Sequence, residues 1–329
     1  MSLVVRGGTV VTTEQMRGAD IVVAGGRIQA VVPPGSADTT GWEVIDAGGL
    51  LVMPGMVDAH VHFQEPGREG WEGFDTGSAA AVAGGVTTVV DMPIDCDPPT
   101  ITAALVAAKA EAARRHSRVD VAIWAGLVPA ALGELEAMMS AGAVGFKAFA
   151  CPSGWDDFPA VDEATLAAGM AVAARFDVPV AVHCELASMG HSAESEVAAV
   201  RWAARLATGA GSRLHVVHAS SAAAVEEARS WPGVTVETCP HYLFLDDADA
   251  ARIGPAAHCS PPIRDAVNRD ALWRHLLSGA IDIVASDHSP CPPAAKAGPH
   301  PWAGIDGVGL SLPLLLSDRR LSPPAVVRL

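Results

Sequence analysis

The sequence predicts an α/β protein, a (β/α)8 TIM barrel that follows a small N-terminal β-sandwich-like subdomain. Eight short apolar segments after Gly55 have the composition of strands, and alanine-rich segments of helical composition separate most of them. Strands that alternate with helices predict parallel βαβ units, and eight such units fit a closed barrel. The first 54 residues carry strand and turn signals without a helical pattern.

The N-terminal segment, residues 1–54, predicts a small antiparallel β subdomain. Its β-branched runs at 2–11, 19–32 and 43–55 are interrupted by Gly-Gly pairs, which are typical of β-hairpin turns. The barrel is then expected over residues 55–329. The chain ends soon after LSLPLLLS, so we expect the eighth helix and the C-terminal strands of the β subdomain to be missing or incomplete.

The barrel elements follow in order along the chain. A doubly wound sheet is the alternative, but it needs a Gly-x-Gly-x-x-Gly turn after the first strand, where this chain reads FQEPGREGWEGF. Helices are expected at 100–116, 132–142, 162–176, 194–210, 221–231 and 264–279. Strands are expected at 56–63, 86–93, 119–127, 143–149, 179–185, 213–220, 234–241 and 281–290.

Composition excludes several classes of partner. With 22 basic and 37 acidic residues the net charge is −15, which argues against nucleic acid and anionic membranes. No apolar segment approaches the roughly 18 residues of a membrane-spanning helix. The six cysteines form no Cys-x-x-Cys pair, so we expect free thiols in a reducing cytoplasm.

Polar residues stand at the ends of five predicted strands, which is where barrel enzymes carry their catalytic groups. The first strand ends in a His-x-His pair whose rings lie on one side of the strand. A lone histidine or lysine in an apolar strand is more often structural, so the prediction of a metal site depends on the set. Nitrogen and oxygen ligands without thiolates suit Zn, Co, Mn or Fe(II). The candidate ligands are His60, His62, Lys147, His183, His218 and Asp287.

Three neighbouring residues are predicted to be structural. His215 lies three residues before His218 and is expected to point to the opposite face of its strand, toward the helices. Cys184 and Cys239 adjoin candidate site residues, but they alternate to the other face and are expected to pack there.

These motifs resemble the cyclic amidohydrolases, a group of the binuclear-metal amidohydrolase superfamily that includes dihydroorotases, hydantoinases (dihydropyrimidinases) and allantoinases. The resemblance runs from about residue 2 to residue 316 and is strongest to the allantoinase group in residues 60–93, GFKAFACPSGWDDF, ETCPHYLF, CSPPIR and ASDHSPCPP. It implies that His60, His62 and Asp287 hold one metal and that His183 and His218 hold the other. It also implies that a carbamate formed by CO₂ on Lys147 bridges two divalent metals, most simply zinc. Asp287 would move a proton from the attacking hydroxide to the leaving ring nitrogen.

The resemblance also implies a substrate. Dihydroorotase-like proteins carry an arginine two residues after the second histidine, where this chain has Gln64, which cannot bind a carboxylate in the same way. A small neutral ureide or hydantoin ring is therefore expected, and most simply ring opening of allantoin to allantoate. The loop after the second strand reads Asp95-Cys96 in place of the usual Asn-Ser, which can change substrate preference. Candidate substrate contacts are Gln64, Ser153, Ser260 and His288.

Alternative functions are a hydantoinase or dihydropyrimidinase, less readily a dihydroorotase, and a non-catalytic scaffold subunit related to these enzymes. A scaffold normally loses metal ligands, and this chain keeps all six candidates. By analogy with similar proteins a homo-oligomer, a tetramer, is expected.

Overall fold

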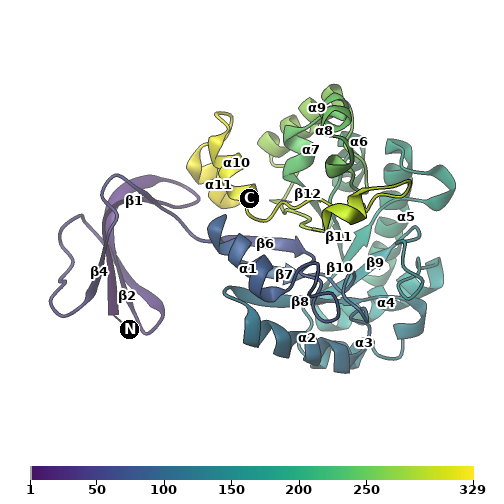
Figure 1. The fold of residues 1–329 in the computed structure, drawn as a ribbon, viewed down its shortest axis with the longest axis horizontal. Helices are drawn as coiled ribbons and strands as arrows, with labels where there is room; N and C mark the ends of the chain where they lie inside the picture. The colour runs from purple at the N-terminus through teal and green to yellow at the C-terminus, as the bar shows by residue number, and fades with distance from the viewer. Residues whose placement is uncertain (1) are drawn as a thin grey trace. The chain divides into compact units, whose positions relative to one another are not determined.

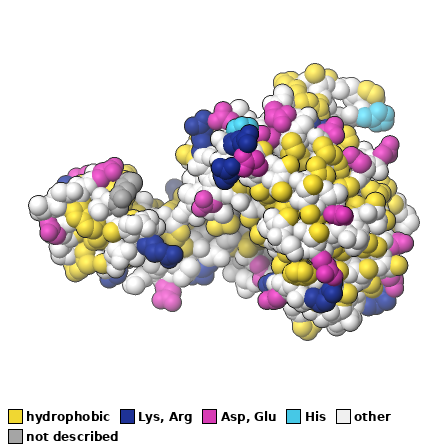
Figure 2. Space-filling model, turned by 90° about the horizontal axis from the view of Figure 1, so that it is seen from below, with side chains coloured by type: hydrophobic (Ala, Val, Ile, Leu, Met, Phe, Trp, Pro, Cys, Tyr) yellow, Lys and Arg dark blue, Asp and Glu magenta, His cyan; other side chains and the backbone are white. Residues whose placement is uncertain are grey.

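The computed structural model describes residues 2–329 and divides them into two compact units. One unit holds the residues before Val57 together with Leu315–Leu329, and the other is Val57–Leu314. Residues 315–329, which the sequence analysis included in the barrel range 55–329, group with the N-terminal unit. On the face drawn in Figure 2, acidic and basic side chains lie interspersed rather than gathered into one patch.

The N-terminal unit is built on one mixed sheet. Strands β3, β2 and β1 are antiparallel, as predicted, but β4 and β5 pair with β1 in parallel, so the prediction of an antiparallel subdomain is wrong for these two strands. The chain crosses over between β3 and β4, and buried Asp20 supports this loop by accepting hydrogen bonds from the amides of Gly7 and Gly35, both at 2.8 Å. The strands are β1 (Ser2–Val11), β2 (Met16–Ala24), β3 (Arg27–Val32), β4 (Glu43–Asp46) and β5 (Leu51–Val52).

The second unit is the predicted barrel. Eight strands lie side by side in chain order, and their described pairings are parallel, which confirms the predicted fold class (Figure 1). Each predicted strand overlaps an observed one. The strands are β6 (Met56–Val61), β7 (Val86–Asp91), β8 (Asp120–Gly126), β9 (Gly145–Phe149), β10 (Pro179–His183), β11 (Arg213–Val216), β12 (Val234–Thr238) and β13 (Ile283–Val284).

Helices cover the outside of the barrel (Figure 1). Side-chain caps begin several of them: Thr102, Asp162, Ser192 and Ser221 accept hydrogen bonds from the third following amide, which satisfies a backbone donor that the helix leaves free. The helices of this unit are α1 (Phe74–Ala83), α2 (Ala103–His116), α3 (Leu135–Ser140), α4 (Glu163–Phe176), α5 (Ala193–Ala210), α6 (Ala222–Arg229), α7 (Pro240–Phe244), α8 (Asp247–Ile253) and α9 (Ala266–Ser278). Helix α10 (Ser311–Ser317) begins in this unit, and α11 (Pro323–Arg328) belongs to the N-terminal one.

The barrel closes between its first strand and the segment that follows its short last strand. Val61 forms a parallel bridge with His288, and the amide of His62 donates to the carbonyl of His288 at 2.8 Å. Buried Asp58 accepts from the amide of Ser286 at 3.0 Å. These contacts bring the ends of β6 and β13 together, so residues near 60 and near 287 share one side of the barrel mouth.

No helix within residues 2–329 is long and apolar enough to cross a membrane. All six cysteines are free thiols, as the sequence predicts, and all but Cys291 are buried.

A buried ion pair holds α2 against the strands beneath the barrel mouth. Lys109 and Asp91 are both fully buried; the ammonium pairs with one carboxylate oxygen and also donates to the carbonyl of Met92 at 2.6 Å. The other oxygen of Asp91 accepts from the amide of Phe63 at 2.8 Å, directly after the His-x-His pair. The pair therefore connects β7, α2 and the end of β6.

We predict that Lys109→Met lowers the free energy of unfolding by about 3–5 kcal/mol, because it leaves the Asp91 carboxylate buried without its cation. Urea denaturation followed by tryptophan fluorescence measures the change. The matched control on the same helix is Arg115→Met, which should have little effect because both Arg115 and its partner Glu111 are exposed. Equal destabilisation by the two substitutions would contradict this, as would a Lys109→Met/Asp91→Asn double variant that recovers no stability.

Candidate metal centre at the barrel mouth

The six predicted ligands lie in one cavity. They come from the ends of β6, β9 and β10 and from the segments that follow β11 and β13, and every one is buried. The cavity has a volume of about 400 Å³, and its wall also includes Phe149, Trp155 and Trp302. The ligand candidates in its lining are His60, His62, Lys147, His183, His218 and Asp287.

Within the cavity the candidates form two adjoining groups. In the first, the Oδ1 atom of Asp287 lies 3.1 Å from Nε2 of His60 and 3.4 Å from Nε2 of His62, and the two Nε2 atoms are 3.3 Å apart. In the second, Nδ1 of His183 lies 3.1 Å from Nε2 of His218. Donor atoms of His60, His218 and Asp287 all lie within 4.8 Å of one another, so the groups share one space.

Buried carboxylates hold the opposite nitrogen of three of these rings. Nδ1 of His60 lies 2.8 Å from Glu237, Nδ1 of His62 lies 3.0 Å from Asp95, and Nε2 of His183 lies 2.7 Å from Glu185. A carboxylate accepts only, so each of these ring nitrogens carries the proton and the other nitrogen presents its lone pair to the cavity. This is the arrangement that orients histidines on metal ions.

The converging lone pairs fit a cation. Lone pairs of His60, His62 and Asp287 that face one another at 3.1–3.4 Å repel unless a positive charge lies among them. Burial lowers the pKa of His60 and of His218, which keeps these rings neutral. Burial also opposes protonation of His62, yet the charges of Asp95 and Asp287 raise its pKa to about 10. The donor set therefore favours an added positive charge, and these residues suit a metal ion.

The backbone at two of the ligands is strained. His218 and Asp287 have φ angles of 39° and 48°, a left-handed conformation that side chains rarely adopt and that costs about 1–3 kcal/mol at each position. The amide of His218 donates to Oε1 of Glu237 at 3.0 Å, which helps to hold this conformation. Such strain persists where the surroundings fix it, and it aims both side chains into the cavity.

Lys147 on β9 differs from an ordinary buried lysine. Burial lowers its pKa to about 8, although the Asp287 and Glu237 charges act in the other direction. Its Nζ atom lies 5.0 Å from the centroid of the Phe149 ring. An amine that loses its proton this readily can act as a nucleophile near neutral pH.

The sequence analysis missed Glu237, which is the main support of the site. Its Oε1 atom accepts from His60 Nδ1 and from the amide of His218, and Oε2 lies 3.3 Å from His215.

The prediction that His215 points toward the helices is wrong: its ring reaches Glu237, which is inside the barrel. The alternation argument failed because β11 ends at Val216, before His218. The signal that could have found Glu237 is the period of two along β12: His215 pairs with Thr235 on that strand, and Glu237 lies two residues further on the same face.

The four candidate substrate contacts divide into two pairs. Ser153 and Ser260 line the cavity, and Oγ of Ser153 donates to the carbonyl of Phe158 at 2.6 Å. Gln64 and His288 are buried but are not among the cavity-lining residues. The Gln64 amide donates to the carbonyl of Pro290 at 2.5 Å, and its Oε1 has no hydrogen-bond partner among residues 2–329. The His288 ring contacts Glu72 and Asp306, which raise its pKa to about 9 against the effect of burial.

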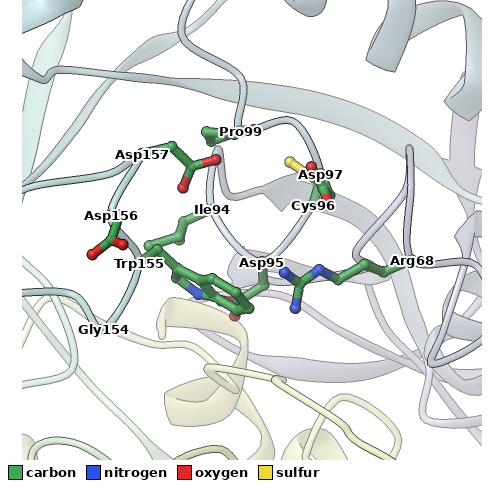
Figure 3. A pocket seen from close by; sticks show the side chains of 10 residues that line it. All are labelled: Arg68, Ile94, Asp95, Cys96, Asp97, Pro99, Gly154, Trp155, Asp156 and Asp157. Carbon is green, nitrogen blue, oxygen red and sulfur yellow. The ribbon is translucent and has the colours of Figure 1, made fainter.

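A second cavity of about 410 Å³ adjoins the first and shares Ile94, Asp95, Gly154 and Trp155 with it (Figure 3). In its wall, the guanidinium of Arg68 makes a cation–π interaction with Trp155, at 3.8 Å from the centroid of the ring. Asp97, Asp156 and Asp157 add carboxylates to this wall.

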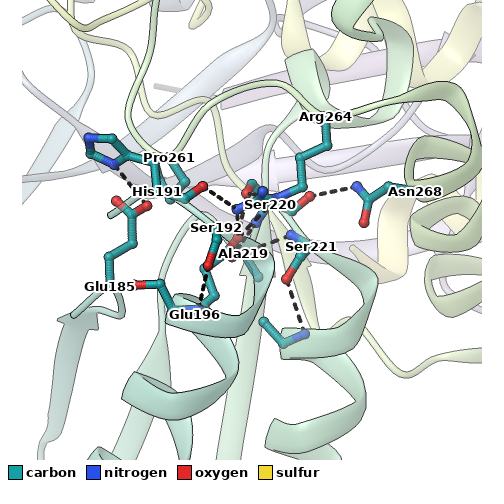
Figure 4. Close-up of polar contacts among 12 residues, drawn as sticks. Glu185, His191, Ser192, Glu196, Ala219, Ser220, Ser221, Pro261, Arg264 and Asn268 are labelled. Carbon is teal, nitrogen blue, oxygen red and sulfur yellow. Dashed lines mark hydrogen bonds and ion pairs between the residues drawn. The ribbon is translucent and has the colours of Figure 1, made fainter. Parts of the chain in front are cut away.

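A buried polar network supports the loops on the other side of the mouth (Figure 4). Glu196 on α5 accepts from the amide and the hydroxyl of Ser220, at 3.0 and 2.7 Å, and pairs with Arg264. Glu185 joins His183 to His191 at the surface, at 3.0 Å. These contacts fix the loops that follow β10 and β11.

Comparison with known proteins agrees with this geometry. A sequence profile described as the amidohydrolase family matches residues 51–298. Proteins named allantoinase from Solibacter usitatus and Rubrobacter xylanophilus are 43% and 44% identical to the chain, over 95% and 96% of it and 74% and 75% of their own lengths. The solved structure of an L-hydantoinase (dihydropyrimidinase) from Arthrobacter aurescens is similar with a TM-score of 0.91 and 32% identity, covering 99% of this chain and 80% of that one. The family resemblance inferred from the motifs is thereby confirmed.

We predict that Glu237→Gln weakens metal binding by about 10–100-fold, because the amide cannot serve all three of its present donors. Metal retained per chain, measured against increasing chelator, gives the change. The control is Glu226→Gln, which alters an exposed carboxylate whose partner is His275 and should leave retention at the parental value. Parental retention in Glu237→Gln would refute the supporting role.

Proposed function

The chain belongs to the amidohydrolase family, and we propose on this premise that it hydrolyses the cyclic amide of allantoin to give allantoate. The observation that carries the proposal is the convergence of six candidate metal ligands in one buried cavity. The choice of substrate is supported by the relatives named allantoinase, which are about 39–44% identical over most of the chain.

The residues divide into two sets of ligands. His60, His62 and Asp287 would hold one divalent transition metal, and His183 and His218 would hold a second, with carboxylated Lys147 between them. Zinc suits these nitrogen and oxygen donors, and Co, Mn or Fe(II) would also be accepted. When bound, the two ions supply positive charge that lowers the pKa of water and polarises an amide carbonyl.

The chain's own groups would complete the reaction. The oxygen of water attacks the ring carbonyl carbon, the carbon–nitrogen bond of the ring breaks, and a carboxylate and a free ureido nitrogen result. Asp287 would take the proton from the attacking water and deliver it to the leaving nitrogen. Ser153 and Ser260 would contact the polar edge of the ring, while Phe149, Trp155 and Trp302 exclude water around it.

The lining favours a small neutral ring. Asp95 and Asp287 already place carboxylates in the cavity, and no arginine is among its lining residues within the part of the chain that the structure describes. A carboxylate-bearing ring such as dihydroorotate would lack a bidentate partner. A hydantoinase or dihydropyrimidinase activity is the second candidate, which the similarity to the Arthrobacter aurescens L-hydantoinase favours. The homotetramer expected from the sequence stays a prediction.

We predict that metal-reconstituted protein turns over allantoin faster than dihydrouracil, 5-substituted hydantoins or dihydroorotate in parallel assays. His60→Ala and Lys147→Ala should reduce turnover to background, because each removes a ligand from the centre. Faster turnover of the hydantoins would assign the second activity instead. If fully metal-loaded protein turns over none of the four substrates, a non-catalytic scaffold subunit is favoured. Undiminished turnover in both variants would refute the assignment of His60 and Lys147 to the metal centre.

We further predict that Lys147 takes up CO₂ as pH rises. Burial lowers its pKa to about 8, so the neutral amine, the only form that reacts with CO₂, becomes abundant between about pH 7 and pH 9. Carbon-13 NMR of metal-free protein at a fixed partial pressure of ¹³CO₂ detects the carbamate. Lys109 provides an internal control, since the charge of Asp91 raises its pKa although burial opposes this. A carbamate signal that persists in Lys147→Met would place it elsewhere.

A further inference from the structure

Asp95 connects the candidate metal centre to the wall of the substrate cavity. It lies in the loop after β7 and lines both cavities. Its two carboxylate oxygens serve different partners: Oδ2 lies 3.0 Å from Nδ1 of His62, and Oδ1 accepts from the indole Nε1 of Trp155 at 3.1 Å. Figure 3 shows its side chain against the Trp155 ring.

We propose that Asp95 is a positioning residue that fixes the His62 ring and the Trp155 indole together, so that the geometry of a metal ligand is coupled to the wall of the cavity. This inference rests on the proposed function for the identity of His62 as a ligand. It adds that the loop after β9, which carries Trp155, influences the metal centre through one carboxylate.

The chemistry of a carboxylate suits this double role. It only accepts hydrogen bonds and offers two oxygens, so it can hold two N–H donors that approach from different sides. An asparagine in its place has one accepting oxygen and would turn its NH₂ group toward the other donor. Asp95 also has a φ angle of 72°, in the left-handed region, and its two charge-assisted contacts offset the cost of this conformation.

The surrounding loops leave Asp95 little freedom. The amide of Asp97 donates to the carbonyl of Pro66 at 2.9 Å, which joins the loop after β7 to the loop after β6. Gly67 sits so close that an added Cβ would lie 1.8 Å from the Asp97 carbonyl oxygen, so no side chain fits there.

Arg68 adds a contact over the face of the indole ring, whereas Asp95 accepts from the N–H at its edge. Its guanidinium lies 3.8 Å from the Trp155 ring centroid, so Trp155 has contacts with both Arg68 and Asp95. The loop of Trp155 is therefore held by the two loops that also position His62. Trp302, whose ring centroid lies 5.8 Å from that of Trp155, shares the cavity wall but donates to the carbonyl of Ser289 instead.

A double-mutant cycle tests the coupling, with Asp95→Ala, Trp155→Phe and the combination of the two. The first readout is metal retained per chain against increasing chelator, which needs no substrate. We expect Asp95→Ala to weaken retention by about 10–100-fold, because it removes both contacts of the carboxylate, and Trp155→Phe to weaken it by a smaller factor. The combined variant should match Asp95→Ala alone, because the second substitution then has no route to His62.

Trp302→Phe is the matched control. It also removes an indole N–H from the cavity wall, but this N–H donates to Ser289 and not to Asp95. It should retain metal like the parent protein and alter only KM, whereas Trp155→Phe should change kcat as well. Parental metal retention in Trp155→Phe, or effects that multiply in the combined variant, would overturn the proposal. If Asp95→Ala does not fold, the comparison of metal retention between Trp155→Phe and Trp302→Phe still tests the coupling.

The proposed activity and the proposed coupling through Asp95 can be refuted independently of each other. A parent protein that binds metal and shows the non-additive cycle, but does not hydrolyse allantoin, would remove the proposed activity and keep the coupling. A parent that hydrolyses allantoin while the two substitutions act independently would keep the activity and remove the coupling.

Discussion

Glu237 joins three strands at the point where the candidate ligands meet. Its Oε1 atom accepts from His60 on β6 and from the backbone of His218 after β11, while Oε2 faces His215. One buried carboxylate thus sets the tautomer of the His60 ring and helps to hold the backbone conformation of His218. It also links the strands that carry these two candidate ligands. Asp95 and Glu185 repeat the first of these tasks at His62 and His183. The lone pairs that face the cavity depend on these three carboxylates.

The closure of the barrel brings the remaining candidate ligand to the site. Asp58 accepts from the amide of Ser286, and His288 bridges to Val61, so Asp287 is held opposite the His-x-His pair despite its left-handed backbone. Lys147 approaches from the far side on β9, where burial disfavours its charge. Left-handed backbone and buried charge are thus gathered around the candidate ligands, and Lys109 with Asp91 forms a further buried ion pair beneath the mouth.

The sequence predicts the barrel and the candidate ligands because both follow from regular patterns. Strand and helix segments alternate, and chemistry-bearing residues end the strands, so His60, His62, Lys147, His183, His218 and Asp287 could be chosen before their positions were known. The supporting carboxylates could not, because Glu237 and Glu185 are ordinary residues until the closed sheet brings them to a ring nitrogen. The prediction for His215 was wrong because it extended the alternation of strand side chains past Val216, where β11 ends. The prediction for β4 was wrong because the chain crosses over before this strand, which pairs with β1 in parallel and not as a hairpin.

The central claim is that the ordered lone pairs of this mouth hold two metal ions. Anomalous diffraction from crystals of zinc-loaded protein, recorded on both sides of the zinc absorption edge, tests it most directly. We expect two peaks, about 3.5–4 Å apart. One should lie among His60, His62 and Asp287, the other beside His183 and His218, and Lys147 should lie between them. A single peak, or peaks away from these side chains, would contradict it.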